Sequence, residues 1–373
     1  MRAPARTTSF STTRGFGAAA LLAASALVLS GCATTAPSTD NADTAAPGSE
    51  VTLVVHDSFG DAEAFSSAAS AATGYAVTVI TAGDGGELTN KLVLTQGAPI
   101  ADAFFGVDNI FASRLIDAGV TQAFTPASLP ARAEALAGEL VADGDASGEV
   151  PMVPIDLGAT CINVDTGWFA ERGIAAPQTY EDLADARYRD LTVLLDPTAS
   201  STGAAFLTGT VEAFGEDGFA DYWTRLVDNG ARIESGWSAA YNGQFTQGGG
   251  EGTRPIVLSY STSPAWTLTE DGERSTTAAL LDTCTTQVEY AGVLAGAANP
   301  TGAQAVVDYL LSREFQDTIA ESMYMYPVDA DAALPAEWQR FAAMPTEPHD
   351  LTPAQIGEGR ERWLKTWSTA VGW

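Results

Sequence analysis

The feature that most restricts the fold is an alternation of strand-like and helix-like segments that begins at Val51. Each strand-like segment is a short apolar run, and a helical pattern separates it from the next one. The predicted strands cover residues 51–55, 76–81 and 101–106, and the predicted helices cover residues 62–72, 87–94 and 109–118. Strands separated by helices pack as parallel βα units. The alternation therefore predicts an α/β fold.

Polar residues stand where these predicted strands end. The three strands lead into His56, Asp57 and Ser58, into Asp84 and Gly85, and into Asp108. Open α/β sheets bind ligands beyond the carboxyl ends of their strands. We therefore expect these residues on one rim of a binding crevice, although each aspartate could instead cap a turn or a helix.

A second candidate segment, residues 196–203, follows a strand-like run in the second half of the chain. It places Ser201, Thr202 and Gly203 at the predicted start of a helix. Free backbone N–H groups at a helix start bind anions. The segment lacks the GxxxxGK[ST] pattern of a nucleotide-hydrolysing P-loop, and an ordinary N-cap with a tight turn is the alternative interpretation.

Four aromatic residues, Trp237, Tyr241, Tyr260 and Trp266, lie among Gly, Ser, Thr and Pro in two short blocks. Rings in such loops can present flat faces to a planar or cationic ligand, with about 0.5–2 kcal/mol per ring for a cation. Each ring could also be a core residue, because Trp and Tyr are usually well buried. The clustering favours a ligand site.

The N-terminus predicts export. Three arginines precede an apolar run over residues 16–29, which is too short to span a bilayer and ends in small residues before Cys32. The tetrapeptide at residues 29–32 resembles a bacterial lipobox. We therefore expect residues 1–31 to be a lipoprotein signal peptide, Cys32 to carry a lipid that anchors the protein to the cell membrane, and residues 32–50 to form a flexible tether.

The chain is strongly acidic, with a formal net charge of −29. Loss of residues 1–31, which hold three arginines and no acidic residue, would bring the charge to −32. Such a surface repels nucleic acid and anionic lipid headgroups. Nucleic-acid partners are therefore excluded, whereas a cationic ligand is compatible with the charge.

Two cysteines, Cys161 and Cys284, remain in an oxidising compartment once Cys32 is assigned to the lipid. Both lie beside strand-like runs, so a disulfide and two buried free thiols are both open. The only histidines are His56 and His349, and no zinc-type spacing of cysteine and histidine occurs. We expect no metal site.

Near the C-terminus, residues 301–322 carry a long amphipathic pattern whose apolar positions we expect to face the core. Residues 323–328 follow as a loop that is a candidate to close on the crevice.

An ordered series of blocks resembles the thiamine-binding components of ABC importers. The blocks are VHDSF, DGGELTNKL, ADAFFGVDN, PIDLGATCINVD, LDPTASSTG, GWSAAY, LSYSTSPAW and MYPV. They cover nearly all of the chain from Val51 to the C-terminal helix. The last three blocks distinguish this family from related binders of ferric iron, polyamines and sugars.

The resemblance implies a two-lobed fold of the class II periplasmic-binding-protein type, with the ligand cleft between the lobes. Lobe 1 would comprise residues 51–157 and about 290–345, lobe 2 residues 158–289, and residues 346–373 a C-terminal helix that packs across both lobes. It also implies a monomeric, extracytoplasmic protein that needs no cofactor, closes on its ligand and delivers it to the membrane subunits of an ABC permease.

The same resemblance assigns roles to several residues. Trp237 would contact the far end of the ligand, and Tyr260 and Trp266 would pack on its rings, with Trp266 in a position where the family commonly has Tyr. Ser201, Thr202 and Gly203 would receive the hydroxyethyl or phosphate end, opposite Asp84 and Gly85. His56 stands where the family usually has Tyr.

Thiamine carries a thiazolium cation, so the pocket needs a negative field, which Asp57 or Asp108 could supply. Two alternatives remain open. One is a binder of polyamines or other small cations; iron binding is disfavoured because no Tyr-Tyr pair occurs. The other is a thiaminase-like enzyme with Cys161 as nucleophile, an interpretation that a disulfide at Cys161 would exclude.

Overall fold

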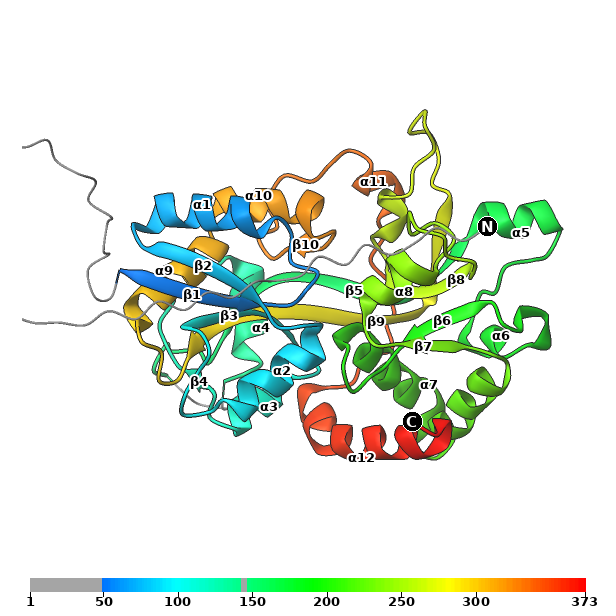
Figure 1. Ribbon diagram of the computed structural model, residues 1–373, viewed down its shortest axis with the longest axis horizontal. Helices are drawn as coiled ribbons and strands as arrows, with labels where there is room; N and C mark the ends of the chain where they lie inside the picture. Colours follow the sequence, from blue (N-terminus) through cyan, green and yellow to red (C-terminus); the bar gives the residue numbers. More distant parts are fainter. Residues whose placement is uncertain (1–48, 142–145) are drawn as a thin grey trace, which may run out of the picture. The chain divides into compact units, whose positions relative to one another are not determined.

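The computed structural model describes residues 49–141 and 146–373 (Figure 1). The predicted signal peptide, Cys32 and residues 33–48 of the predicted tether lie outside the described residues. The first strand begins at Glu50, which the sequence placed at the end of the tether. In the described part of the chain, no helix is long and apolar enough to cross a membrane.

The predicted alternation is confirmed in the first part of the chain. Strands β1 (Glu50–Val55), β2 (Ala76–Thr81) and β3 (Ala103–Asp108) are parallel, and helices α1 (Ala62–Thr73), α2 (Gly85–Leu94) and α3 (Ala112–Asp117) follow them. Strand β3 begins two residues later than predicted. Asp102 stays outside it because its carboxylate accepts the N–H groups of Thr52 and Asn299, 2.9 Å from each.

Two long antiparallel strands, β5 (Val153–Asp165) and β9 (Thr277–Leu294), run through the centre of the molecule (Figure 1). They pair with each other along most of their length, and the sheet order through them is β2-β1-β3-β9-β5-β8-β6-β7. We call residues 50–157 and 289–328 lobe 1, and residues 158–288 lobe 2. The two crossing strands therefore connect the lobes.

Lobe 2 contains three further sheet strands and the helices that cover them. The strands are β6 (Thr192–Leu195), β7 (Arg232–Glu234) and β8 (Ile256–Tyr260). The helices are α5 (Thr166–Arg172), α6 (Tyr180–Leu183), η1 (Ala186–Tyr188), α7 (Ser201–Asp228), α8 (Trp237–Gln244) and η2 (Ser263–Ala265). Their core includes the buried rings of Phe206, Tyr222 and Trp223.

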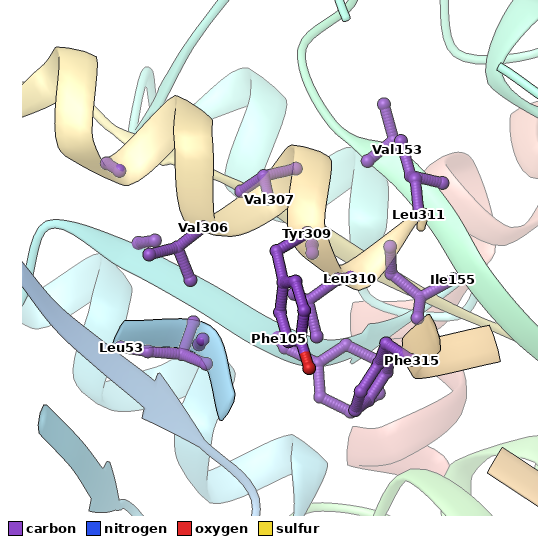
Figure 2. Close-up of a cluster of buried hydrophobic side chains, with 14 of the residues drawn as sticks. Leu53, Phe105, Val153, Ile155, Val306, Val307, Tyr309, Leu310, Leu311 and Phe315 are labelled. Carbon is purple, nitrogen blue, oxygen red and sulfur yellow. The ribbon is translucent and has the colours of Figure 1, made fainter. Parts of the chain in front are cut away.

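Lobe 1 is completed by α4 (Ala131–Gly138), the short strands β4 (Thr121–Gln122) and β10 (Tyr326–Pro327), and the helices α9 (Pro300–Leu310) and α10 (Arg313–Ser322). Figure 2 shows the side chains of α9 and α10 facing those of β1 and β3, with Leu53, Phe105, Val306, Leu310 and Phe315 in one buried cluster. The amphipathic pattern at 301–322 thus faces the core as predicted, but it forms two helices. The break occurs because the Ser312 side chain caps α10 by accepting the Phe315 N–H.

The segment after residue 328 does not belong to lobe 1 alone, which corrects the predicted boundary at 345. Helix α11 (Trp338–Phe341) packs against η2 of lobe 2, and Arg340 donates to the carbonyl oxygens of Gly272 and Glu273. Trp338 is buried beside Ala265 of lobe 2 and Ala320 of lobe 1. The segment bridges the lobes because its indole ring fills a space that both of them line.

The C-terminal helix α12 (Pro353–Val371) also contacts both lobes. Trp363 and Trp367 enter the core of lobe 2, whereas Ile356 joins the apolar cluster that contains Phe111. The Arg360 guanidinium lies 5.0 Å from the centre of the Phe111 ring. These contacts agree with the expected position across the lobes.

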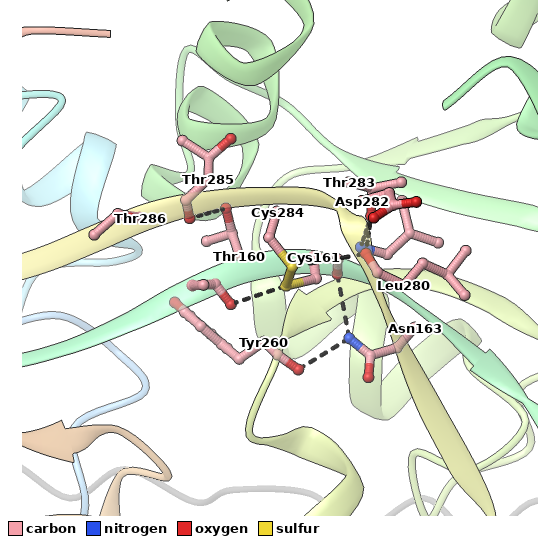
Figure 3. Close-up of a disulfide and its surroundings, with 12 residues drawn as sticks. Thr160, Cys161, Asn163, Tyr260, Leu280, Asp282, Thr283, Cys284, Thr285 and Thr286 are labelled. Carbon is pink, nitrogen blue, oxygen red and sulfur yellow. Dashed lines mark hydrogen bonds between the residues drawn. A yellow bond between two sulfur atoms is a disulfide. The ribbon is translucent and has the colours of Figure 1, made fainter. Parts of the chain in front are cut away.

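A disulfide joins Cys161 of β5 to Cys284 of β9, with Cα atoms 4.3 Å apart (Figure 3). Both cysteines are fully buried. The bond lies where the β5–β9 register shifts, between the Thr160–Thr285 and Ile162–Leu280 pairs. It therefore fixes the two strands to each other inside lobe 2, about four residues from where each strand crosses between the lobes.

Candidate functional site

A cavity of about 370 Å³, which we call the interlobe cavity, is lined by residues of both lobes. Eleven of the predicted ligand residues line it: His56, Asp57, Ser58, Asp84, Gly85, Ser201, Thr202, Trp237, Tyr241, Tyr260 and Trp266. Its volume lies within the ordinary range for small-molecule sites, about 300–1,000 Å³. The structure thus brings together residues that are up to 210 positions apart in the sequence.

Asp84 connects the two lobes at one side of the interlobe cavity. It is the N-cap of α2, and its Oδ1 accepts the Gly85 N–H at 2.6 Å. The same oxygen accepts the Ser201 N–H at 3.0 Å, and Oδ2 accepts the Trp237 N–H at 3.0 Å. Burial raises the pKa of Asp84, although the bonds from Trp237 and Ser201 oppose this shift. The Asp84 carboxylate thus accepts N–H groups from the first turns of three helices, α2, α7 and α8.

Glycine at the start of α2 allows this close approach. A Cβ added at Gly85 would lie 2.7 Å from Ser201 Oγ, and one at Gly86 would lie 2.5 Å from the Ala199 carbonyl oxygen. The Glu87 N–H donates to that same carbonyl at 2.9 Å. Glycine at positions 85 and 86 is therefore needed for this contact between the lobes.

His56 and Glu289 meet at a buried side of the interlobe cavity. His56 Nδ1 accepts the Ser58 N–H at 3.2 Å, so the neutral ring carries its proton on Nε2, which lies 3.6 Å from Glu289 Oε2. Burial lowers the pKa of His56, whereas Glu289, and then Asp84 and Asp57, raise it; the net pKa lies above the ordinary value of 6.5. While Nδ1 accepts the Ser58 N–H, the ring is neutral and its Nε2–H faces the Glu289 carboxylate.

The aromatic residues form two groups around the interlobe cavity. Trp237 stacks on Tyr241, with ring centroids 4.8 Å apart and an interplanar angle of 12°, and its Nε1 donates to Ser259 Oγ at 2.9 Å. Trp266 is 59% exposed and lies 4.6 Å, centroid to centroid, from Tyr324. The first group is held rigidly, while the second presents an open indole face.

Tyr260 and Tyr324 are positioned by local hydrogen bonds. The Tyr260 hydroxyl lies 3.0 Å from Thr202 Oγ1, and burial raises its pKa well above the usual range. Tyr324 has a φ of 57°, unusual for a residue other than glycine, and its carbonyl accepts the Thr262 hydroxyl at 2.6 Å. Backbone strain of this kind occurs often at ligand sites.

Two predicted ligand residues do not line the interlobe cavity. Asp108 is fully buried, and its Oδ1 accepts the N–H groups of Ile110 and Phe111 at 3.0 and 3.2 Å, so it has the capping role that the sequence left open. Gly203 packs inside lobe 2, where a Cβ would lie 2.8 Å from the Leu195 carbonyl oxygen. Neither position lines the cavity, because the Asp108 side chain and the Cα of Gly203 face the protein interior.

Several lining residues were missed: Phe59, Gly60, Ser238, Asn242, Ser263, Glu289, Ser322, Met323, Tyr324 and Met325. The last three lie in the loop that the sequence marked as a candidate to close on the crevice. The sequence also held an indication of Glu289 as a site residue, because it is an acidic residue inside the apolar run that forms β9. In the described ranges, no group of three or more His, Cys, Asp or Glu residues is arranged to hold a metal ion.

Known proteins resemble this chain along most of its length. The thiamine-binding periplasmic proteins of Escherichia coli K12 and Salmonella typhimurium LT2 are each 28% identical to it, over 77% and 86% of this chain and 82% and 93% of their own. A solved periplasmic thiamin binding protein superposes with a TM-score of 0.73 at 26% identity, covering 86% of this chain and 96% of its own.

Likeness at lower identity supports the fold alone. The periplasmic binding protein AfuA from Actinobacillus pleuropneumoniae superposes with a TM-score of 0.68 at 17% identity, over 87% of this chain and 98% of its own.

The model of the bacterial extracellular solute-binding protein family matches residues 98–346. Two lobes, two crossing strands, a cavity between the lobes and this match together show that the chain belongs to the bacterial extracellular solute-binding proteins.

Proposed function

We propose that this protein is the substrate-binding component of an ABC importer and that its ligand is thiamine or a thiamine phosphate. The observation that carries the proposal is the interlobe cavity, in which the aromatic rings of Trp237, Tyr241, Tyr260 and Trp266 from lobe 2 face carboxyl groups of lobe 1. The names of the relatives support the same ligand. A flat cation with two rings needs this combination of surfaces.

The arrangement of the lining residues gives the ligand a direction. The exposed face of Trp266, with Tyr324 beside it, suits a planar ring at the mouth of the cavity. Asp84, Gly85, Ser201 and Thr202 lie together at the α2 and α7 helix starts, where the hydroxyethyl or phosphate end would be received. His56 fills the wall where related proteins usually have Tyr.

Binding would act through closure of the lobes. Ligand contacts that both lobes make exist only when the lobes are together, so a ligand shifts the population toward the closed state by that differential affinity. A membrane permease would then recognise the closed form. Chemical change of the ligand is not required, and Cys161 cannot act as a thiolate nucleophile while it is bonded to Cys284.

Membership of the extracellular solute-binding family places the protein outside the cytoplasm. We further propose that lipid on Cys32 anchors it to the cell membrane, that it acts as a monomer, and that it needs no cofactor. The acidic net charge of −29 is compatible with a cationic ligand and disfavours nucleic acid.

Intrinsic tryptophan fluorescence tests the ligand class. Thiamine should quench the emission of Trp237 and Trp266 in a saturable way, whereas putrescine, a linear amine without rings, should not change it. A response to putrescine alone would replace the proposal with a polyamine binder.

A further inference from the structure

Three acidic side chains stand side by side on three neighbouring strands. Glu289 of β9 pairs in register with Asp108 of β3 on one side and with Asp156 of β5 on the other. We call these three residues the carboxyl row. Directly paired residues on adjacent strands point to the same face of a sheet, so the row brings three carboxyl groups together beneath the interlobe cavity.

Two β-bulges produce this alignment. The register shifts at Gly106 of β3, between Phe105 and Val107, and at Ile155 of β5, between Pro154 and Asp156. Gly106 has a φ of +97°, and a Cβ there would lie 2.0 Å from His56 Cδ2. Bulges re-aim side chains and occur often beside functional sites. Here the two bulges align the three residues of the carboxyl row, and Gly106 leaves room for the imidazole of His56.

The outer members of the carboxyl row have few partners. Within the described residues, no donor reaches either oxygen of Asp156 or Oδ2 of Asp108. Burial raises the pKa of both groups well above the usual range, and the charge of Glu289 raises it further. Asp156 can hydrogen-bond only to the Glu289 carboxyl group beside it. Burial thus disfavours the charged form of both aspartates.

Glu289 is the member that faces the cavity and has donors. Its Oε1 accepts from Gln287 Nε2 at 3.3 Å, and its Oε2 lies 3.6 Å from His56 Nε2. His56 is 8% exposed, lines the interlobe cavity, and has no hydrogen-bond partner at Nε2 in the described structure. An atom of a bound ligand would supply the hydrogen-bond partner that His56 Nε2 lacks in the described structure.

The ionisable groups that surround Glu289 come from five other elements: His56 and Asp57 after β1, Asp84 before α2, Asp108 in β3, Asp156 in β5 and Tyr260 in β8. Asp57 is exposed, and Asp84 already accepts three N–H groups. Tyr260 holds its proton because burial raises its pKa. Glu289 is thus the buried carboxyl group of this set that lines the cavity and accepts no backbone N–H in the described structure.

We propose that Glu289 is the residue that makes the interlobe cavity selective for a cationic ring, acting as its counter-ion, with Asp108 and Asp156 beside it on the neighbouring strands. This inference rests on the proposed function and specifies which charge recognises the ligand. It differs from the sequence prediction, which assigned the negative field to Asp57 or Asp108.

The test compares thiamine with its neutral isostere, in which a thiophene ring replaces the thiazolium. The full chain and its variants are titrated with both ligands, and the affinity ratio of cation to neutral isostere is measured. The wild type should prefer the cation. Glu289→Gln should reduce that preference by about 10–100-fold, a range set by a charge pair in a partly screened site.

Glu63→Gln is the matched control, because it makes the same chemical change at an exposed carboxylate of lobe 1 that does not line the cavity; it should change the ratio less than about threefold. Equal losses of both ligands in Glu289→Gln would overturn the inference, as would a wild type that binds both ligands equally. Glu289→Asp keeps the charge and should keep the preference even if Glu289→Gln does not fold. A wild type that binds neither ligand would instead refute the proposed function.

Discussion

The carboxylate of Asp84 should hold the two lobes together, and its removal should open them. Two of its hydrogen bonds cross between the lobes, from the Ser201 and Trp237 N–H groups, each at 3.0 Å. A hydrogen bond to a charged group contributes about 1.5–3 kcal/mol net. Burial of the carboxylate, which raises its pKa, offsets part of that gain.

We therefore expect the two bonds to favour the closed state by about 2–3 kcal/mol, which corresponds to about a 30–150-fold change in the ratio of closed to open molecules. Asp84→Ser tests this value because serine still caps α2, as a good N-cap residue, but is too short to reach lobe 2. The variant should show a larger radius of gyration by small-angle X-ray scattering without ligand, and weaker thiamine binding.

Asp61→Ser is the matched control. Asp61 caps α1 of lobe 1 in the same way, by accepting the Glu63 and Ala64 N–H groups, and it makes no bond to lobe 2. The two variants lose the same charge from the same lobe. If Asp84→Ser matched Asp61→Ser in both radius of gyration and thiamine affinity, the proposed role of Asp84 in holding the two lobes together would be refuted.

Three further predictions follow from the disulfide, the carboxyl row and the cavity mouth. Replacing both Cys161 and Cys284 by alanine should lower the free energy of unfolding in urea by about 2–5 kcal/mol; an unchanged value would show that the bridge is not structural. The pKa of Asp156 in the folded state is raised well above its ordinary value of 3.8. The stability that the protonated Asp156 contributes is therefore fully present below pH 3.8 and is lost as the pH rises through the raised pKa. Asp156→Asn should therefore be at least as stable as the wild type at pH 8, with a smaller loss of stability between pH 5 and pH 8, and lower stability at pH 8 would contradict this sign. Trp266→Ala should weaken thiamine binding about 5–30-fold through loss of the ring face, whereas Trp373→Ala, equally exposed at 59%, should leave affinity unchanged; similar effects of the two would count against a role for Trp266 in binding.

Local patterns made much of the fold predictable. The first three strands and the three helices that follow them were found because apolar periodicity and turn residues are properties of neighbouring residues. Most of the lining residues were found for a similar reason, since His56, Asp84 and Ser201 follow strand ends in a fold class whose strand ends form the crevice.

The failures concern features that distant residues decide. Asp108 caps the turn after β3, and Glu289, which had no predicted role, lines the cavity; the bulges at Gly106 and Ile155 set the register of β3, β9 and β5 that places them. No local pattern reports such pairing. The residues after 328 likewise bridge the lobes only because the Trp338 ring packs against residues of both lobes, Ala265 and Ala320.

Isothermal titration calorimetry of residues 33–373 with thiamine, its monophosphate and its diphosphate tests the central claim most directly, with the ligand checked afterwards for breakdown. The account predicts one-to-one binding of at least one of these ligands, which is recovered intact. No heat with any of the three would contradict the assignment of the ligand, and turnover would contradict the assignment as a binding protein.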